Sequence, residues 1–139
     1  SRLKLELTES RTAEDTPQFL TVMRTVLELG VSIWIDDFGT GQSSLSYLKN
    51  LPVSTVKIDK DFVAELGTDA GDIEYLTGII QTVRSRRKQV VVEGIGNAAQ
   101  YELVRELPVD LLQGFHFARP MPAADLASLL RSNASLPRE

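Results

Sequence analysis

Five short apolar segments alternate with longer helix-like stretches along the chain, and this alternation limits the fold more than any other feature. The segments are predicted strands at residues 3–7, 31–35, 55–58, 89–92 and 110–112. Most of them are rich in Val, Ile or Leu, as is typical of parallel strands buried on both faces. Such alternation predicts an α/β fold with crossover helices, either an open doubly wound sheet or a (β/α)8 barrel.

The stretches between these strands carry the signals of helix ends. The first helix is predicted at residues 17–29, with Thr16 as its N-cap, Pro17 at its first position and Gly30 beyond its end. Further helices are expected at residues 44–48, 73–86, 97–107 and after Pro122. Trp34, in the second strand, is expected to pack in the core.

Each predicted strand ends in a polar side chain. These side chains are Glu6, Asp36, Lys57, Glu93 and Gln113. Because the carboxyl ends of parallel strands meet at one rim, a ring of such groups is the arrangement of a barrel enzyme. An eight-stranded barrel needs about 250 residues, so a chain of 139 residues would form a little over half of one. We assign residues 1–131 to this partial domain of about five βα units, and residues 132–139 to a polar tail.

Four carboxylates in one barrel mouth, from Glu6, Asp36, Asp37 and Glu93, would repel one another without compensation. Divalent cations are the usual compensation, and all-oxygen ligands suit Mg²⁺ or Mn²⁺. Two adjacent aspartates can serve two metals about 3.5–4 Å apart, an arrangement that activates water for phosphoryl transfer. Lys57, the one cation among the strand ends, would hold the attacking water or a phosphate oxygen.

Single acidic strand ends are usually only solvated carboxylates. The doublet Asp36-Asp37 is harder to explain in that way, because it ends an apolar strand and enters the glycine-containing segment Phe38-Gly39-Thr40-Gly41. That segment is not a P-loop, since no Gly-Lys-Ser/Thr follows it.

The composition excludes some classes of function. A net charge of −4 argues against binding of DNA or RNA. The absence of cysteine excludes disulfides and favours a reducing compartment. Neither a signal peptide nor an apolar run of about 20 residues is visible. We expect a cytoplasmic location, either in a soluble protein or in the cytoplasmic part of a membrane-anchored one.

Taken together, five motifs closely resemble the EAL domain family, in that family's order and spacing and over essentially the whole chain. They are Glu6-Leu7-Thr8-Glu9-Ser10, Asp36-Asp37-Phe38-Gly39-Thr40-Gly41-Gln42-Ser43-Ser44-Leu45, Lys57-Ile58-Asp59, Glu93-Gly94-Ile95 and Gln113-Gly114-Phe115. The resemblance implies the C-terminal portion of a modified, TIM-like (β/α)8 barrel. It also implies hydrolysis of cyclic di-GMP to linear pGpG with Mg²⁺ or Mn²⁺ at a two-metal site.

Site residues follow from motif position in this resemblance. The implied metal ligands are Glu6, Asp36, Asp37 and Glu93. The implied catalytic residues are Glu93 as general base, Lys57 beside the attacking water, and Gln113 in the water and metal network. Glu9 resembles the carboxylate that anchors the loop after Asp37, and the element from Gly39 to Leu48 resembles the one that links a homodimer interface to the active site. Asp59 and Arg119 are assigned to substrate binding.

The family pattern is incomplete in this chain. The Glu-Ala-Leu motif and the asparagine-bearing strand after it would lie upstream of Ser1, so we expect the 139-residue chain alone to be inactive. Gly96 replaces a common glutamate, and Gln42 a common aromatic residue. Both departures favour the alternative of a degenerate domain that senses cyclic di-GMP or binds a protein. A sensory or GGDEF domain is expected upstream. An enolase-type barrel would not explain the Asp36-Asp37 motif.

Overall fold

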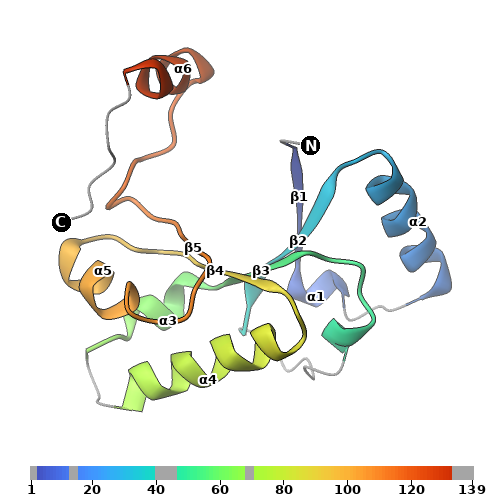
Figure 1. The fold of residues 1–139 in the computed structure, drawn as a ribbon, viewed down its shortest axis with the longest axis horizontal. Helices are drawn as coiled ribbons and strands as arrows, with labels where there is room; N and C mark the ends of the chain where they lie inside the picture. The colour runs from blue at the N-terminus through green and yellow to red at the C-terminus, as the bar shows by residue number, and fades with distance from the viewer. Residues whose placement is uncertain (1–2, 13–15, 40–46, 68–70, 133–139) are drawn as a thin grey trace.

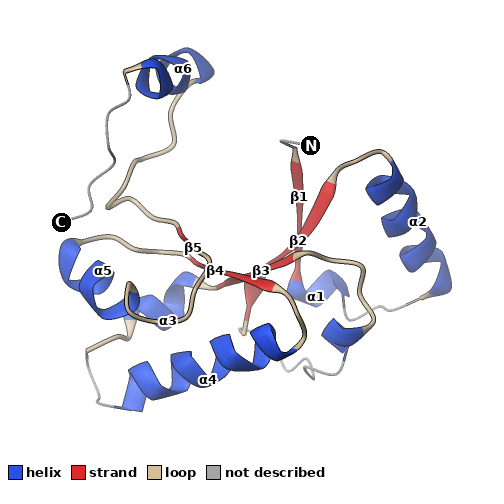
Figure 2. Cartoon of the chain, in the orientation of Figure 1, coloured by secondary structure: helices blue, strands red, loops and turns tan. Residues whose placement is uncertain are grey.

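The described residues form a five-stranded parallel sheet with most of the helices packed against it (Figures 1 and 2). The structure, a computed structural model, describes residues 3–12, 16–39, 47–67 and 71–132. The strands are β1 (Lys4–Thr8), β2 (Ser32–Phe38), β3 (Thr55–Ile58), β4 (Gln89–Val92) and β5 (Leu111–Leu112). The predicted α/β fold is confirmed, and the strand bounds differ from the predicted ones by at most three residues.

Strand order decides between the two folds that the sequence left open. The described strands lie in the order β1-β2-β3-β4-β5, and every neighbouring pair is parallel. A doubly wound sheet reverses its strand order at a switch point, whereas a barrel adds each strand beside the previous one. The sheet is therefore part of a barrel, and within the described residues β1 and β5 are its open edges.

The described helices are α1 (Glu9–Thr12), α2 (Pro17–Glu28), α3 (Lys60–Ala64), α4 (Gly71–Ser85), α5 (Ala98–Val104) and α6 (Ala123–Arg131), with a 3-10 turn η1 (Tyr47–Lys49). Two of them, α1 and α3, were not predicted from the sequence; both are short and directly follow strands. Residues 44–46 of the predicted helix at 44–48, and residues 133–139 of the predicted tail, lie outside the described residues. None of the described helices has the length and hydropathy needed to cross a bilayer.

Helix α2 begins and ends as its sequence predicts. The hydroxyl of Thr16 accepts a hydrogen bond from the N–H of Phe19 at 3.2 Å, and Pro17 lies in the first turn. Gly30 follows the helix with φ of 78°, and its N–H donates to the carbonyl of Leu27. A local side-chain hydrogen bond at the start and the backbone conformation of a glycine at the end thus account for the two ends of this helix.

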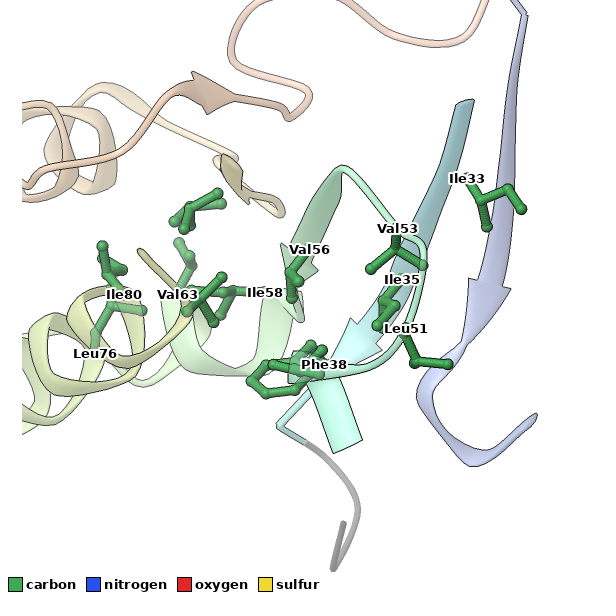
Figure 3. Close-up of a cluster of buried hydrophobic side chains, with 14 of the residues drawn as sticks. Ile33, Ile35, Phe38, Leu51, Val53, Val56, Ile58, Val63, Leu76 and Ile80 are labelled. Atoms are coloured by element: carbon green, nitrogen blue, oxygen red, sulfur yellow. The ribbon is translucent and has the colours of Figure 1, made fainter. Parts of the chain in front are cut away.

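The hydrophobic core lies between one face of the sheet and the helices. Figure 3 shows Ile35, Val56 and Ile58 of the sheet with Leu76 and Ile80 of α4, and all five are fully buried. Successive residues of a strand point to opposite faces. The alternate positions of β2 and β3 therefore face the other side, which would be the inside of the barrel.

Trp34 lies on this inner face, and the prediction that it packs in the core is wrong. It is half-buried, and Lys4 Nζ lies 5.7 Å from its ring centroid. The apolar core takes the alternate residues Ile33 and Ile35 instead. Strand alternation could have placed Trp34 correctly, because it separates this residue from both isoleucines.

Candidate active site

A bulge in β2 puts two consecutive aspartates outside the core. Ile35 pairs with Val56 and Phe38 with Ile58, so β2 advances by three residues over the length in which β3 advances by two. Asp37 lies in this bulge with φ of 55°, a conformation that aspartate tolerates better than most residues. Phe38 thereby returns to the core at 3% exposure. Regular alternation would instead have sent Asp36 and Asp37 to opposite faces.

Lys57 is the centre of the carboxylate cluster. Its ammonium lies 2.7 Å from Asp36 Oδ1, 3.0 Å from Glu93 Oε2 and 3.1 Å from Glu6 Oε2. The lysine side chain is 4% exposed, whereas that of Glu6, on the edge strand β1, is 41% exposed. Strands β1, β2, β3 and the end of β4 thus each bring one of these charged groups to the same rim, as the sequence predicts.

The charges of the cluster are unbalanced. Burial by itself would lower the pKa of Lys57, but the close approach of Asp36, Glu93 and Glu6 raises it well above its ordinary value. Burial raises the pKa of Glu93; Lys57 lowers it in part, and Asp36 and Asp37 add to the rise. One ammonium does not neutralise the carboxylates around it, so binding of a further cation or of a proton at the rim is favourable.

Asp36, Asp37 and Glu93 could hold a cation together. Each offers a carboxylate oxygen, and these oxygens all lie within 4.8 Å of one another. Burial also raises the pKa of Asp37, with Asp36 and Asp59 adding to the effect. Asp36 Oδ1 is buried and lies 2.7 Å from the Lys57 ammonium. This donor set fits a hard divalent ion.

Glu9 lies where an anchor for the segment after Asp37 is expected. The N–H of Gly39 donates to Glu9 Oε2 at 2.9 Å, and Glu9 is only 3% exposed. Gly39 has φ of 100°, and a Cβ at this position would lie 2.6 Å from the ring of Phe62. The backbone conformation therefore favours glycine, and a side chain here would also have to displace the ring of Phe62 in α3. Residues 40–46, which include Gln42, lie outside the described part of the chain.

Gln113 lies beside Glu93 in a cavity of about 490 Å³. The cavity is lined by Lys60, Asp61, Ala64, Glu93, Gly94, Gly96, Gln113, Gly114 and Phe115. The N–H of Ile95 donates to the Gln113 carbonyl at 3.1 Å, so the segments after β4 and β5 are joined next to the rim. A Cβ at Gly114 would collide with the backbone of Ile95, which explains why only glycine fits there.

Asp59 lies beside Asp37 of the carboxylate cluster, whereas Arg119 contacts an aromatic residue of the cavity. Asp59 caps α3, since its carboxylate accepts from the N–H of Asp61 at 2.8 Å, and its charge helps to raise the pKa of Asp37. The Arg119 guanidinium lies 4.5 Å from the ring centroid of Phe115, which lines the cavity. Three further cavity residues, Lys60, Asp61 and Ala64, were not predicted. The N-cap residue Asp59 could have indicated them, because it predicts that a helix begins directly after β3.

A family model of the EAL domain matches residues 1–120 of the chain. Among curated proteins, the bifunctional diguanylate cyclase/cyclic di-GMP phosphodiesterase MucR of Pseudomonas aeruginosa is 44% identical over 126 residues, which are 91% of this chain and 18% of MucR. The cyclic di-GMP phosphodiesterase NbdA of the same organism is 38% identical over 130 residues, covering 94% of this chain and 17% of NbdA. The chain therefore spans less than a fifth of each of these relatives.

Solved structures agree with this match. The EAL domain of Mycobacterium smegmatis DcpA superimposes with a TM-score of 0.85 at 36% identity, over 95% of this chain and 59% of that one. The MucR phosphodiesterase in complex with c-di-GMP gives a TM-score of 0.81 at 44% identity, over 89% of this chain and 50% of that one. With its sequence motifs, its part-barrel sheet and a family model that covers most of its length, the chain belongs to the EAL domain family.

Proposed function

We propose that the chain forms part of a metal-dependent phosphodiesterase that hydrolyses cyclic di-GMP to linear pGpG. The observation that carries this proposal is the contact of one buried ammonium, that of Lys57, with the carboxylates of Glu6, Asp36 and Glu93 at a single rim. The names of MucR and NbdA, both cyclic di-GMP phosphodiesterases, support the choice of substrate.

The proposed cofactor is Mg²⁺ or Mn²⁺ at a two-metal site. Asp36, Asp37 and Glu93 would hold it, with Glu6 as a further ligand, because their oxygens gather at the rim with more negative charge than Lys57 offsets. Bound there, such ions would lower the pKa of a water molecule and stabilise charge on the phosphate oxygens.

Residues of the chain itself would carry out the proton transfer and orient the attacking water. Water attacks the phosphorus and its proton passes to a carboxylate oxygen of Glu93, while the bond from phosphorus to the leaving ribose oxygen breaks and that oxygen takes up a proton from solvent, so the cyclic dinucleotide becomes linear. The Glu93 carboxylate lies 3.0 Å from the Lys57 ammonium, which puts a proton acceptor and a proton donor together at the rim. Lys57 remains protonated and can donate to the water or to a phosphate oxygen, and Gln113 can orient the same water from the adjoining cavity.

Supporting roles are proposed for residues around this rim. Glu9 would anchor the segment that begins at Gly39, as its hydrogen bond suggests. Asp59 would act through Asp37, and Arg119 would contact a substrate phosphate or base from its position on Phe115. The proposed homodimer element from Gly39 to Leu48 falls mostly on residues 40–46, outside the described residues.

The proposal also concerns the whole protein. A sensory or GGDEF domain would precede this region in a cytoplasmic signalling protein, as the double activity in the name of MucR suggests. The 139-residue chain alone would have little or no activity, because Glu6 lies on β1, which is an edge strand within the described residues, and is 41% exposed. Fixed metal geometry tolerates little displacement of its ligands.

A degenerate domain that binds cyclic di-GMP without turnover is the second candidate. Gly96 favours it, because this position lines the cavity but offers no side chain to a ligand. The N–H of Gly96 donates to Gln100 Oε1 at 2.8 Å, so the backbone there already has a partner.

Chromatographic detection of pGpG in the presence of Mn²⁺ tests both candidates. A protein that contains this chain within a complete EAL domain should convert cyclic di-GMP to pGpG, and Glu93→Gln should lower kcat at least a hundredfold. Glu102→Gln, which alters an exposed carboxylate paired with Arg105 away from the rim, is the matched control and should retain full activity. Binding of cyclic di-GMP without any pGpG would establish the sensor instead. Release of pGpG by the isolated 139-residue chain, abolished by Glu6→Gln, would contradict its proposed inactivity.

A further inference from the structure

The cavity beside Glu93 is bounded by three separate segments of the chain. Its lining residues come from α3, from the turn after β4 and from the turn after β5. Backbone hydrogen bonds join the two turns: the N–H of Ile95 donates to the Gln113 carbonyl at 3.1 Å, and the carbonyl of Ile95 accepts from the N–H of His116 at 2.9 Å. The position of α3 relative to these joined turns therefore sets the width of the cavity.

The side-chain amide of Gln100 connects α3 to the turn after β4. Gln100 Oε1 accepts a hydrogen bond from the N–H of Gly96 at 2.8 Å, and Gln100 Nε2 donates to the carbonyl of Val63 at 3.3 Å. Gly96 lines the cavity without a side chain, and Val63, in α3, is fully buried. A carboxamide carries a donor and an acceptor on one group, so Gln100 can satisfy both backbone partners at once.

Stabilisation of α5 would explain only one of these two hydrogen bonds. Gln100 is the third residue of α5, and its own N–H donates to the N-cap residue Asn97 at 3.0 Å. A glutamine at this position commonly reaches back to the backbone at the start of its helix, as in a capping box. The bond to Gly96 fits that role. The bond to Val63 reaches a different helix and does not contribute to a cap.

The groups proposed for the chemistry are held independently of this connection. Lys57 lies in β3, and the N–H of Glu93 donates to the carbonyl of Ile58 at 3.3 Å, which continues the pairing of β3 with β4. The sheet therefore positions both groups at the rim. Loss of the Gln100 hydrogen bonds would affect the cavity wall and leave the rim in place.

We propose that Gln100 is a positioning residue that sets the width of this cavity for the part of the substrate next to the cleaved phosphodiester. The inference rests on the proposed function, because it assigns the cavity to the same substrate. Without the bond to Val63, α3 can move away from the turn at Gly96, and the substrate is held less firmly. The expected signature is a raised KM with little change in kcat.

Two substitutions of Gln100 test the proposal in a protein that contains this chain within a complete EAL domain. Gln100→Met removes both hydrogen bonds without adding charge, whereas Gln100→Glu keeps an acceptor for Gly96 and loses the donor to Val63. Both should raise KM for cyclic di-GMP at least fivefold, with kcat within twofold of the wild type. The same two substitutions at Gln81, exposed on α4, are the matched controls and should leave both constants within twofold.

Hydrogen exchange adds a measurement that does not require turnover. The amides of Glu65 and Leu66, which follow α3 and are hydrogen-bonded to it, should exchange at least threefold faster in both variants. The Gly96 amide should exchange faster in Gln100→Met alone. Circular dichroism should show that both variants remain folded.

The pattern across the two variants decides the outcome. A raised KM in Gln100→Met alone would assign Gln100 to the cap of α5, and a raised KM in Gln100→Glu alone would reflect the added charge. Either result, a fall in kcat at constant KM, or unchanged exchange at Glu65 and Leu66 would overturn the proposal. A wild-type protein that forms no pGpG would instead contradict the proposed function, and the exchange rates would still decide whether Gln100 holds α3.

Discussion

The ammonium of Lys57 lies 2.7 Å from Asp36 Oδ1, closer than to the oxygens of Glu6 and Glu93. Asp36 and Lys57 come from adjacent strands, and the bulge after Ile35 lies beside their contact. A nearly fully buried lysine is costly unless acidic groups surround it. Its position therefore depends on the same carboxylates that we propose as metal ligands, so charge balance at the rim should affect stability as well as catalysis.

Replacement of Lys57 by Met should destabilise the metal-free protein. Removal of one partner from a buried ion pair typically costs about 3–5 kcal/mol, and the lower end of this range applies here because Glu6 is partly solvated. Urea unfolding in EDTA measures the loss. Addition of Mn²⁺ should restore part of it, since a bound cation would again offset the carboxylates. Lys49→Met, at an exposed lysine of η1, should change the free energy of unfolding by less than about 0.5 kcal/mol. A Lys57→Met variant as stable as the wild type in EDTA would show that the lysine does not balance this charge.

Loss of the Glu9 carboxylate should destabilise the chain near Gly39. Glu9→Ala removes a buried acceptor and leaves the Gly39 N–H without it, at a cost of about 1–3 kcal/mol. Glu9→Gln keeps an acceptor oxygen and should cost less than half as much. Chemical denaturation of both variants provides the measurement. Equal losses for Ala and Gln would mean that the negative charge, and not the hydrogen bond, is what matters at this position.

Two glycine substitutions should have opposite effects. Gly94 has φ of 84°, and a Cβ there would collide with Lys60 at the start of α3, so Gly94→Ala should cost more than about 1 kcal/mol. Gly78 lies within α4 with no atom within 4 Å of an added Cβ, so Gly78→Ala should stabilise the chain by about 0.5–1 kcal/mol. Thermal melts of both variants test these signs. A stabilised Gly94→Ala protein would mean that the turn after β4 can relax.

The pH dependence of stability should report the environment of Glu93. Burial raises the folded-state pKa of this carboxyl above its ordinary value of 4.5, even after the opposing effect of Lys57. The folded chain then holds this proton to higher pH than the unfolded chain does. The free energy of unfolding should therefore fall as pH rises from about 4.5 through the folded-state pKa, and become level above it.

Glu93→Gln removes this dependence. In EDTA, the wild-type free energy of unfolding minus that of Glu93→Gln should decrease as pH rises from 4.5 towards neutrality. Urea denaturation at several pH values measures this difference, in which groups that titrate alike in both proteins cancel. A difference that increased with pH would mean that Lys57 dominates the environment of Glu93.

Much of the fold could be read from local patterns. The strand cores around Val56 and Val91 have apolar β-branched side chains, and Thr16 and Gly30 mark the ends of α2 by local hydrogen bonding and backbone conformation. Short helices such as α3 were missed because a few residues give little periodicity, although Asp59 is a recognisable cap. Trp34 lies outside the core although it is apolar, because the strand alternation puts it on the opposite face from Ile33 and Ile35.

The sequence by itself determined which chemical groups stand at the strand ends, because residue type and strand periodicity are local properties. Only the tertiary structure decided that Asp36 and Asp37 share a rim, since the bulge depends on the register between β2 and β3. It also decided that Lys57 contacts both Glu6 and Glu93, although the three residues lie far apart in the sequence. Distances of this kind depend on the order and pairing of strands, which no stretch of sequence encodes alone.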